Sequence, residues 1–343
     1  MAPWPGSTAG LPGQYDPTTE ARLAQLDRDA TRHVEDNRPE KTRSGYRADW
    51  RAWERFCAET GLPPLAVRSG TLVLFVEWCW IQPGRRPGAL MAPATIDRRL
   101  SGVVVTARRQ HRLVLPVEIA EEARALLKAK VTAMEKAGEQ RGHGPAEALL
   151  VRHMEAIAAT VPPGRTGIRD LALMSLHFAV AGREHELAAL RLRDVTDDAE
   201  GRGLVVDIRV SKISPRTVQV PYGTRAHLCP VRSWHRWREA ADLTDPDGHA
   251  FRRLHNRWAT VMDAGLSPEA VGDVLTRLGA RANLPIRPTG HSPRRGLVTE
   301  SARAGNDDRQ AEKQGGWAPG SKVMRRYRED DDGFRENALH GVL

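Results

Sequence analysis

A polar, glycine-rich segment at residues 135–147, EKAGEQRGHGPAE, most constrains how this chain folds. The segment has no apolar periodicity, so neither a helix nor a strand formed from it would have a side to bury. Residues 18–136 show helical spacing throughout, whereas residues 148–343 mix helical spacing with strand-like alternation. The sequence therefore predicts two domains, 18–136 and 148–343, joined by a linker at 137–147, as suits a chain of 343 residues.

The first predicted domain consists of consecutive helices. In the segment 41–61, aromatic residues recur at helical spacing until Gly61 and the two prolines that follow end the pattern. Further segments with the length and apolar content of helices are 69–84, 93–111 and 118–138. We therefore expect an all-helical N-terminal domain.

The second predicted domain adds a small β element to its helices. We expect helices at 147–160 and 167–181. The runs LVVDIRV (204–210) and TVQVP (217–221) are rich in β-branched residues, alternate in polarity and are joined by the turn-like SKISPR. This is the one convincing strand pair that the pattern indicates. The predicted fold class is mainly α with a small β-sheet.

The apolar runs are too short to cross a bilayer. The longest, 71–81 and 171–181, are interrupted by Glu77 and His177, and a spanning helix needs roughly 20 apolar residues. Residues 1–17 are rich in proline and glycine and lack the charged start and apolar stretch of a signal peptide. We therefore expect a disordered N-terminal tail and a cytoplasmic protein.

The cysteine and histidine patterns favour neither a disulfide framework nor a metal site. The cysteines are three in number and lie far apart, at Cys57, Cys79 and Cys229, with no CxxC pair. The 12 histidines form no HExxH motif and no Cys/His cluster. We expect no structural metal and no cofactor.

The charge of the chain indicates a polyanionic partner. The formal net charge is +9 and the isoelectric point is near 9.9, which favours a nucleic acid over a neutral ligand. Arginine greatly outnumbers lysine, and arginine binds phosphate through two hydrogen bonds. The nucleotide bias of a GC-rich genome explains the arginine excess equally well, so the ratio alone does not identify the partner.

Arg183 and Lys212 are candidate phosphate-binding residues. Arg183 opens a predicted helix in FAVAGREHELAALRLRDV, where a cation opposes the helix dipole unless it helps to bind an anion. A surface ion pair with Glu184 or Glu186 explains the same pattern. Lys212 lies in the turn of the predicted hairpin, a position at which most lysines are simply solvated.

His291 and Arg294 form a second basic pair in TGHSPRRGLVTESARAG, residues 289–305. Thr289 or Ser292 is suited to cap a helix there, and a proline fits its first turn. Residues three apart share a helix face, so His291 and Arg294 present an imidazole and a guanidinium to one phosphate. A basic surface helix is the alternative.

Tyr327 lies on a short basic segment near the C-terminus, in GGWAPGSKVMRRYRED. Its spacing from Val323 and Met324 predicts that the three side chains share one face of a final helix. The tyrosine is therefore either a core aromatic residue or a reactive hydroxyl beneath the surface, activated by neighbouring cations. The nearby GGWAPGSK imitates a phosphate-binding loop, but Lys322 is one place late and no strand precedes it, so we do not expect ATP binding.

Taken in order, these segments resemble the tyrosine recombinase (phage integrase) family, and the resemblance covers nearly the whole chain. AGREHELAALRLRDV is similar to the first arginine box, VSKISPRTVQVP to the β-hairpin, HSPRRG to the HxxR box, QGGWAPG to the His/Trp position and MRRYRE to the tyrosine box. CPVRSW and YRADWRAWERFC are also similar to common segments of these enzymes. The spacing from Trp317 to Tyr327 is one residue longer than usual, and the extra residue falls in the loop APGS.

The resemblance implies a role for each matched residue. The catalytic set that it implies is Arg183, Lys212, His291, Arg294, Trp317 and Tyr327. In this scheme Tyr327 is the nucleophile and Lys212 is the general acid. The remaining four stabilise the phosphate, while Glu186 and Leu187 form a structural pair after Arg183.

The resemblance also implies the fold and the reaction. The expected architecture is an all-helical, core-binding (SAM-like) N-terminal domain and an α+β catalytic domain that ends in a tail helix at 333–343. The expected activity is site-specific recombination of double-stranded DNA through a 3′-phosphotyrosyl intermediate, without ATP or metal, by a homotetramer on two DNA sites. Accessory DNA-bending proteins are possible partners, and the tail helix is expected to dock on a neighbouring subunit. A type IB topoisomerase and an inert DNA-binding regulator are the alternatives.

Overall fold

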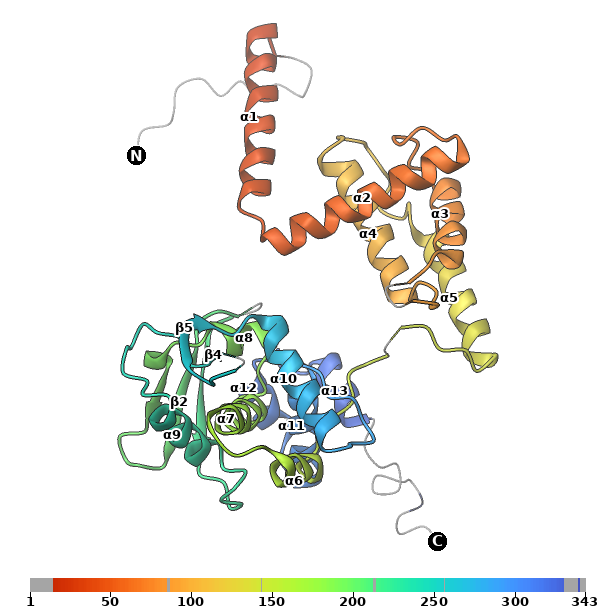
Figure 1. The fold of residues 1–343 in the computed structure, drawn as a ribbon. Helices are drawn as coiled ribbons and strands as arrows, with labels where there is room; N and C mark the ends of the chain where they lie inside the picture. Colours follow the sequence, from red (N-terminus) through yellow and green to blue (C-terminus); the bar gives the residue numbers. More distant parts are fainter. Residues whose placement is uncertain are drawn as a thin grey trace. The chain divides into compact units, whose positions relative to one another are not determined.

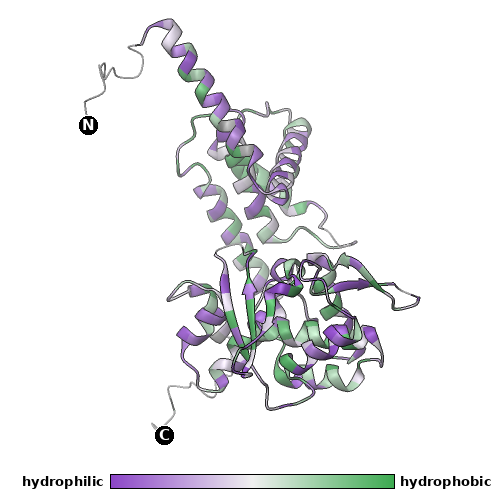
Figure 2. Ribbon diagram, turned by 90° about the vertical axis from the view of Figure 1, so that its left-hand side faces the viewer, coloured by the Kyte–Doolittle hydropathy of each residue, from purple (hydrophilic) through white to green (hydrophobic). Residues whose placement is uncertain are grey.

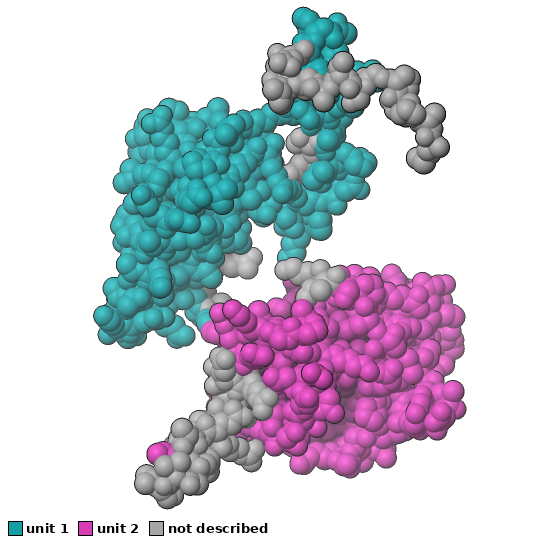
Figure 3. Space-filling view, turned by 180° about the vertical axis from the view of Figure 1, so that it is seen from behind, with its two compact units in different colours: residues 1–144 teal, residues 145–343 magenta. Residues whose placement is uncertain are grey.

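The computed structural model describes residues 15–84, 87–142, 144–211, 214–255, 257–329 and 339. The chain divides into two compact units, residues 1–144 and 145–343, which Figure 3 shows in different colours. The division falls inside the polar segment 135–147. Residues 1–14 of the predicted disordered tail, Lys212 and all of the predicted tail helix except residue 339 lie outside the described residues.

The first unit is helical (Figure 1). Its helices are α1 (Pro17–Asp36), α2 (Glu40–Thr60), α3 (Ser69–Ile81), α4 (Pro93–Arg109) and α5 (Glu121–Lys136). Four of them coincide with the segments expected from helical spacing. In Figure 2, α1 is mostly hydrophilic, whereas hydrophobic residues gather on the inner sides of the other helices.

Aromatic packing forms the core of the first unit. Trp53, Phe56 and Phe75 are almost completely buried, and their ring centroids lie 5.2–5.3 Å apart in tilted and edge-on arrangements that aromatic pairs prefer. Helix α2 ends where Gly61 adopts a φ of 69° and its N–H bonds to the Cys57 carbonyl, a common helix stop. The spacing in 41–61 therefore marks a genuine buried helix face.

The second unit combines helices with two small antiparallel sheets (Figure 1). Its helices are α6 (Val151–Thr160), α7 (Arg165–Ala179), α8 (Glu184–Ala189), the short 3-10 helix η1 (Leu192–Asp194), α9 (Pro230–Ala240), α10 (Pro268–Arg281), α11 (Ser292–Arg303), α12 (Asp308–Gly315) and α13 (Lys322–Glu329). Its strands are β1 (Val195–Asp197), β2 (Gly203–Ile208), β3 (Arg216–Pro221), β4 (Arg252–Leu254) and β5 (Val261–Gly265). The fold class is the expected one, mainly α with a small β component.

The central sheet has the order β1-β2-β3, and Val206 pairs with Val218 across β2 and β3. Val218 and Val220 are buried while Thr217 and Gln219 are exposed, so the predicted alternation sets which side of the hairpin faces the core. The buried side joins α7 and α9 in one hydrophobic core that includes Trp234.

The expectation of a single strand pair was wrong. Strand β1 extends the central sheet, and β4 and β5 form a second, two-stranded sheet. Strands β1 and β4 have three residues each, and β5 reads VMDAG. Such short, partly polar strands carry too little alternation to be detected, because they form through pairing with a partner strand rather than through their own apolar pattern.

Two expectations about helix ends also need correction. His291, rather than Thr289 or Ser292, is the N-cap residue of α11, because the Ser292 hydroxyl accepts a hydrogen bond from the Thr289 N–H in the turn before the helix. Val323 does not share the buried face of α13: it is 54% exposed, whereas Met324 is fully buried. Helical spacing allowed both Val323 and Met324 to share a face with Tyr327, but of these three only Met324 and Tyr327 pack with Val298 and Ala311.

No helix in the described parts of the chain is long and apolar enough to cross a membrane. The cysteines Cys57, Cys79 and Cys229 are all free and buried.

Candidate active site

A tight turn between α7 and α8 places Arg183. After α7, Ala181 adopts a φ of 44°, and a side chain at Gly182 would come within 2.2 Å of the Leu187 side chain. Nε2 of the buried His177 lies 3.2 Å from the Gly182 carbonyl oxygen, and this contact stabilises the turn. A larger residue here would have to displace the buried Leu187 side chain. Arg183 follows as the N-cap residue of α8.

The Arg183 guanidinium is tied to a buried carboxylate. Nη1 of Arg183 donates to Oε1 of Glu186 at 2.7 Å, and the Arg183 backbone N–H donates to Oε2 at 3.0 Å. A surface ion pair with Glu184 or Glu186 was the alternative left open for Arg183; the pair with Glu186 is internal, since Glu186 is 1% exposed. This contact fixes both the backbone and the side chain of Arg183.

Glu186 remains ionised although it is buried. Burial by itself raises the pKa of Glu186, but the hydrogen bond and charge of Arg216, together with the backbone and side chain of Arg183, lower it to about 2. The carboxylate therefore stays negative at any ordinary pH.

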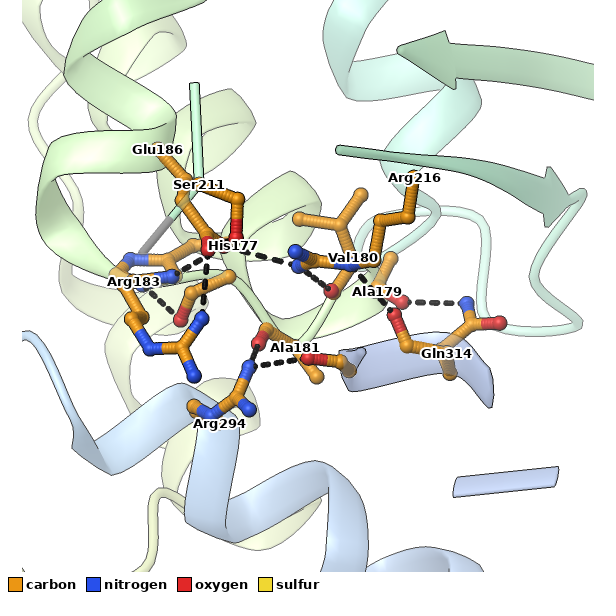
Figure 4. A network of polar contacts seen from close by, with 12 residues as sticks. His177, Ala179, Val180, Ala181, Arg183, Glu186, Ser211, Arg216, Arg294 and Gln314 are labelled. Carbon is orange, nitrogen blue, oxygen red and sulfur yellow. Dashed lines mark hydrogen bonds and ion pairs between the residues drawn. The ribbon is translucent and has the colours of Figure 1, made fainter. Parts of the chain in front are cut away.

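Arg294 enters the same site from α11. Its side chain is buried, and its Nη1 donates to the carbonyl oxygens of Ala181 and Gly315, the latter at 2.7 Å. In the described part of the chain its Nη2 has no hydrogen-bond partner. Burial, and next the charge of Arg183, lower the pKa of Arg294 to about 9. Arg294 is thus a buried cation that bonds through Nη1 (Figure 4), while its Nη2 is unpartnered among the described residues.

Trp317 and Tyr327 complete the described part of the site. Gly316, the C-cap residue that follows helix α12, has a φ of 64°, and the chain then places the Trp317 ring 3.6 Å from the Arg294 guanidinium carbon. Trp317 and Tyr327 meet edge-on, with ring centroids 6.2 Å apart. Tyr327 is partly buried beside the fully buried Met324, and it packs against the small cluster of Val298 and Ala311.

His291 lies at the start of α11, exposed to solvent. Burial lowers the pKa of the buried His177 to about 4, the Gly182 contact opposes this shift, and the charge of His291 is the next cause that lowers it. The two imidazoles are therefore neighbours. His177 is the buried, neutral one, and His291 is the one on the open side.

Of the six predicted site residues, the structure brings Arg183, Arg294, Trp317 and Tyr327 together and places His291 at the edge of the group. The sixth, Lys212, lies outside the described residues, between Ser211 and Ser214.

Sequence reasoning missed two residues that shape the site. His177 supports the turn before Arg183, and its position as a polar residue inside the apolar run 171–181 was the available signal. Arg216 contacts Glu186 and begins β3, four residues after Lys212. Its only signal was its place in the hairpin segment.

Comparison with known proteins gives the family of the chain. Residues 147–333 match the model of the phage integrase family. An integrase/recombinase XerD homolog of Selenomonas ruminantium is 26% identical over 322 residues, which cover 91% of this chain and 88% of that protein.

Solved structures show the same fold. The Tn1549 transposon integrase in complex with transposon right end DNA has a TM-score of 0.58 at 16% identity, over 93% of this chain and 98% of that chain. A lambda integrase tetramer bound to a Holliday junction has a TM-score of 0.55 at 15% identity, over 92% of this chain and 82% of that chain. The chain belongs to the phage integrase family and is a tyrosine-type site-specific DNA recombinase.

Proposed function

We propose that this recombinase cuts and rejoins duplex DNA through a covalent bond between Tyr327 and a 3′ phosphate. The observation that carries the proposal is the grouping of Arg183, Arg294 and Trp317 beside Tyr327. Arg294 lies over the Trp317 ring at 3.6 Å, and Trp317 meets Tyr327 edge-on at 6.2 Å. A tyrosine hydroxyl in the same group as the buried guanidinium of Arg294 and the fixed guanidinium of Arg183 suits attack on a phosphodiester.

In the cleavage step, Oη of Tyr327 forms a bond to phosphorus, and the bond from phosphorus to the 5′ oxygen breaks. Negative charge grows on the two nonbridging oxygens, and Arg183 and Arg294 stabilise it because guanidinium stays charged and donates to two oxygens at once. The unpartnered Nη2 of Arg294 is a donor of this kind, already desolvated. The Trp317 indole N–H is proposed as a further donor.

Two proton transfers accompany the step. Lys212 gives its proton to the departing 5′ oxygen, and His291, on the open side of the site, takes the proton of the tyrosine hydroxyl. The phosphotyrosine ester conserves the energy of the broken bond, so a 5′ hydroxyl of a second strand can attack it and reseal the DNA without ATP. The side-chain cations provide the charge that the phosphate needs.

We propose double-stranded DNA as the partner and a tetramer on two DNA sites as the working assembly. The net charge of +9 suits a polyanion. The lambda integrase, which shares the fold, has been seen as a tetramer bound to a Holliday junction. For this chain the assembly follows from the need to hold two duplexes while strands are exchanged.

Covalent capture tests the proposal. The full chain is incubated with nicked duplexes that tile the DNA on both sides of its gene, and adducts that survive denaturing electrophoresis are sequenced. A nick traps the reaction because the short cleaved strand diffuses away. We expect an adduct with the unmodified chain, none with Tyr327→Phe, and an undiminished adduct with Tyr222→Phe, the matched control at a 44% exposed tyrosine of the same unit.

The same experiment separates the alternative functions. A DNA-binding regulator gives no adduct with any duplex. A type IB topoisomerase gives an adduct and relaxes supercoiled DNA but yields no hybrid product from two differently labelled duplexes. An adduct that survives Tyr327→Phe contradicts the proposed nucleophile.

A further inference from the structure

Arg295 follows Arg294 on α11 and is 8% exposed, yet the mechanism above gives it no role. Its Nη1 donates to the carbonyl oxygen of Ala146 at 2.9 Å. Its guanidinium carbon lies over the ring of Tyr327, 5.5 Å from the centroid, which is within the range of a cation–π contact. One buried side chain therefore joins the tyrosine to a backbone segment that comes much earlier in the chain.

The segment that holds Arg295 is itself fixed on α11. We call residues 146–151 the entry segment. The Leu149 N–H donates to the Ser292 carbonyl oxygen at 3.0 Å, and the Val151 N–H donates to Oε1 of Glu300 at 3.2 Å. Leu149 is also fully buried in the core of the second unit. The carbonyl that Arg295 binds therefore belongs to a backbone that is hydrogen-bonded to the same helix.

Tyr327 depends on such contacts because α13 has little apolar support. The helix has eight residues, too few to be stable alone, and only a small apolar cluster supports it in the described part of the chain. Helix α13 packs on α11 (Figure 1). From α11 the Thr299 hydroxyl donates to the Tyr327 carbonyl oxygen at 3.2 Å. Thr299 thus holds the tyrosine backbone, and Arg295 contacts its ring.

We infer that Arg295 is a positioning residue for the nucleophile: anchored on the entry segment, its guanidinium holds the Tyr327 ring in the orientation for attack. The inference rests on the proposed function, in which Tyr327 is the nucleophile. Arginine suits the task because its planar guanidinium bonds a carbonyl in its plane while it contacts an aromatic ring. Loss of Arg295 should therefore change the surroundings of the ring and slow the attack together.

Fluorine NMR reads the position of the ring directly. The chain has four tyrosines, so labelling the full chain with 3-fluorotyrosine gives one signal for each. The signal that disappears in Tyr327→Phe belongs to Tyr327. In Arg295→Met we expect this signal to move toward the position of the free amino acid, while the other three stay in place. The spectra are recorded without DNA, so this readout does not depend on recombination.

Single-turnover adduct formation, on the nicked duplex found by covalent capture, measures the attack. We expect Arg295→Met to lower the rate at saturating DNA about 10-fold, the scale of one buried cation–π contact, with an unchanged half-saturating DNA concentration. Arg295→Lys keeps the charge without the planar group and should recover part of the rate. Arg232→Met is the matched control: Arg232 lies 5.3 Å from the Tyr222 ring centroid, so its loss should move the Tyr222 signal alone and leave the rate unchanged.

The two readouts separate the inference from the proposed function. A Tyr327 signal that moves, with a slower adduct at an unchanged half-saturating concentration, supports the inference. A Tyr327 signal that stays in place, or a normal rate despite a moved signal, overturns it. If the unmodified chain forms no adduct with any duplex, the proposed function fails and the inference falls with it, whatever the spectra show. Where Arg295→Met fails to fold, Arg295→Lys decides by the same criteria.

Discussion

Replacing Glu186 with glutamine tests whether one buried carboxylate holds the site together. The side chain keeps its volume but loses its charge, and the guanidinium groups of Arg183 at 2.7 Å and Arg216 at 2.9 Å lose their counter-ion. Removing one partner of a buried ion pair is costly because the other charge stays buried and uncompensated. We expect Glu186→Gln to destabilise the second unit.

The pKa of the carboxyl group sets the size of the effect. Folding lowers the pKa of Glu186 from 4.5 to about 2, which corresponds to about 3 kcal/mol because each pKa unit is worth about 1.4 kcal/mol. Since the pKa falls on folding, this stability is present above about pH 4.5 and is lost as the pH falls through about 2. The stability gap between the two proteins should therefore be about 3 kcal/mol at about pH 7.5 and about 2 kcal/mol at about pH 3.5.

Urea unfolding followed by circular dichroism measures this gap, with two transitions fitted because the chain holds two compact units. The matched control is Glu155→Gln in α6, where the carboxylate pairs with Arg225 and His227 at the surface, and surface pairs contribute little. If Glu186→Gln costs no more than the control, or if its gap stays constant down to about pH 3, Glu186 does not hold the site electrostatically.

Three further predictions concern the same region. Arg294→Lys keeps the charge but removes the planar guanidinium, in which Nη1 bonds Ala181 and Gly315 while a separate Nη2 has no partner among the described residues, so single-turnover adduct formation should slow about 100-fold. Gly315→Ala places a methyl group 1.9 Å from the Trp317 ring, so it should shift the near-ultraviolet circular dichroism of the indole and slow adduct formation; an unchanged spectrum with a normal rate contradicts the packing. Burial lowers the pKa of His177 to about 4, so its contribution to stability is present above about pH 6.5 and lost toward pH 4. Unfolding across that range should depend less on pH in His177→Gln.

Much of the fold could be predicted because the information is local. Helix α2 repeats its buried residues every three or four positions and stops at a glycine, and β3 alternates buried and exposed residues. Each pattern describes one element against one core. Each site motif is also a short stretch of sequence, and the order of these motifs along the chain was sufficient to indicate the phage integrase family.

The features that could not be predicted depend on contacts between distant parts of the chain. Arg216 meets Glu186 across 30 positions and Gln314 across 98, and nothing in the residues near Arg216 distinguishes it from the many surface arginines of this sequence. Val323 and Met324 are equally apolar on α13, and only the position of α11 and α12 decides which one is buried. The spacing of residues within one helix or strand does not show which distant residues will contact each other.

The charges at the centre of the site explain why this arrangement suits a phosphodiester. Arg183, Arg216 and Arg294 surround one carboxylate, Glu186, which leaves these four side chains with a net charge of two positive. A buried excess of cations is unfavourable in the free protein, as the lowered pKa of Arg294 shows. In the proposed reaction, attack on phosphorus builds two negative charges on the phosphate, and they meet an excess of cations that is already fixed. The single carboxylate orients the arginines without neutralising them, so we expect the strongest attraction in the transition state of that reaction rather than in the resting enzyme.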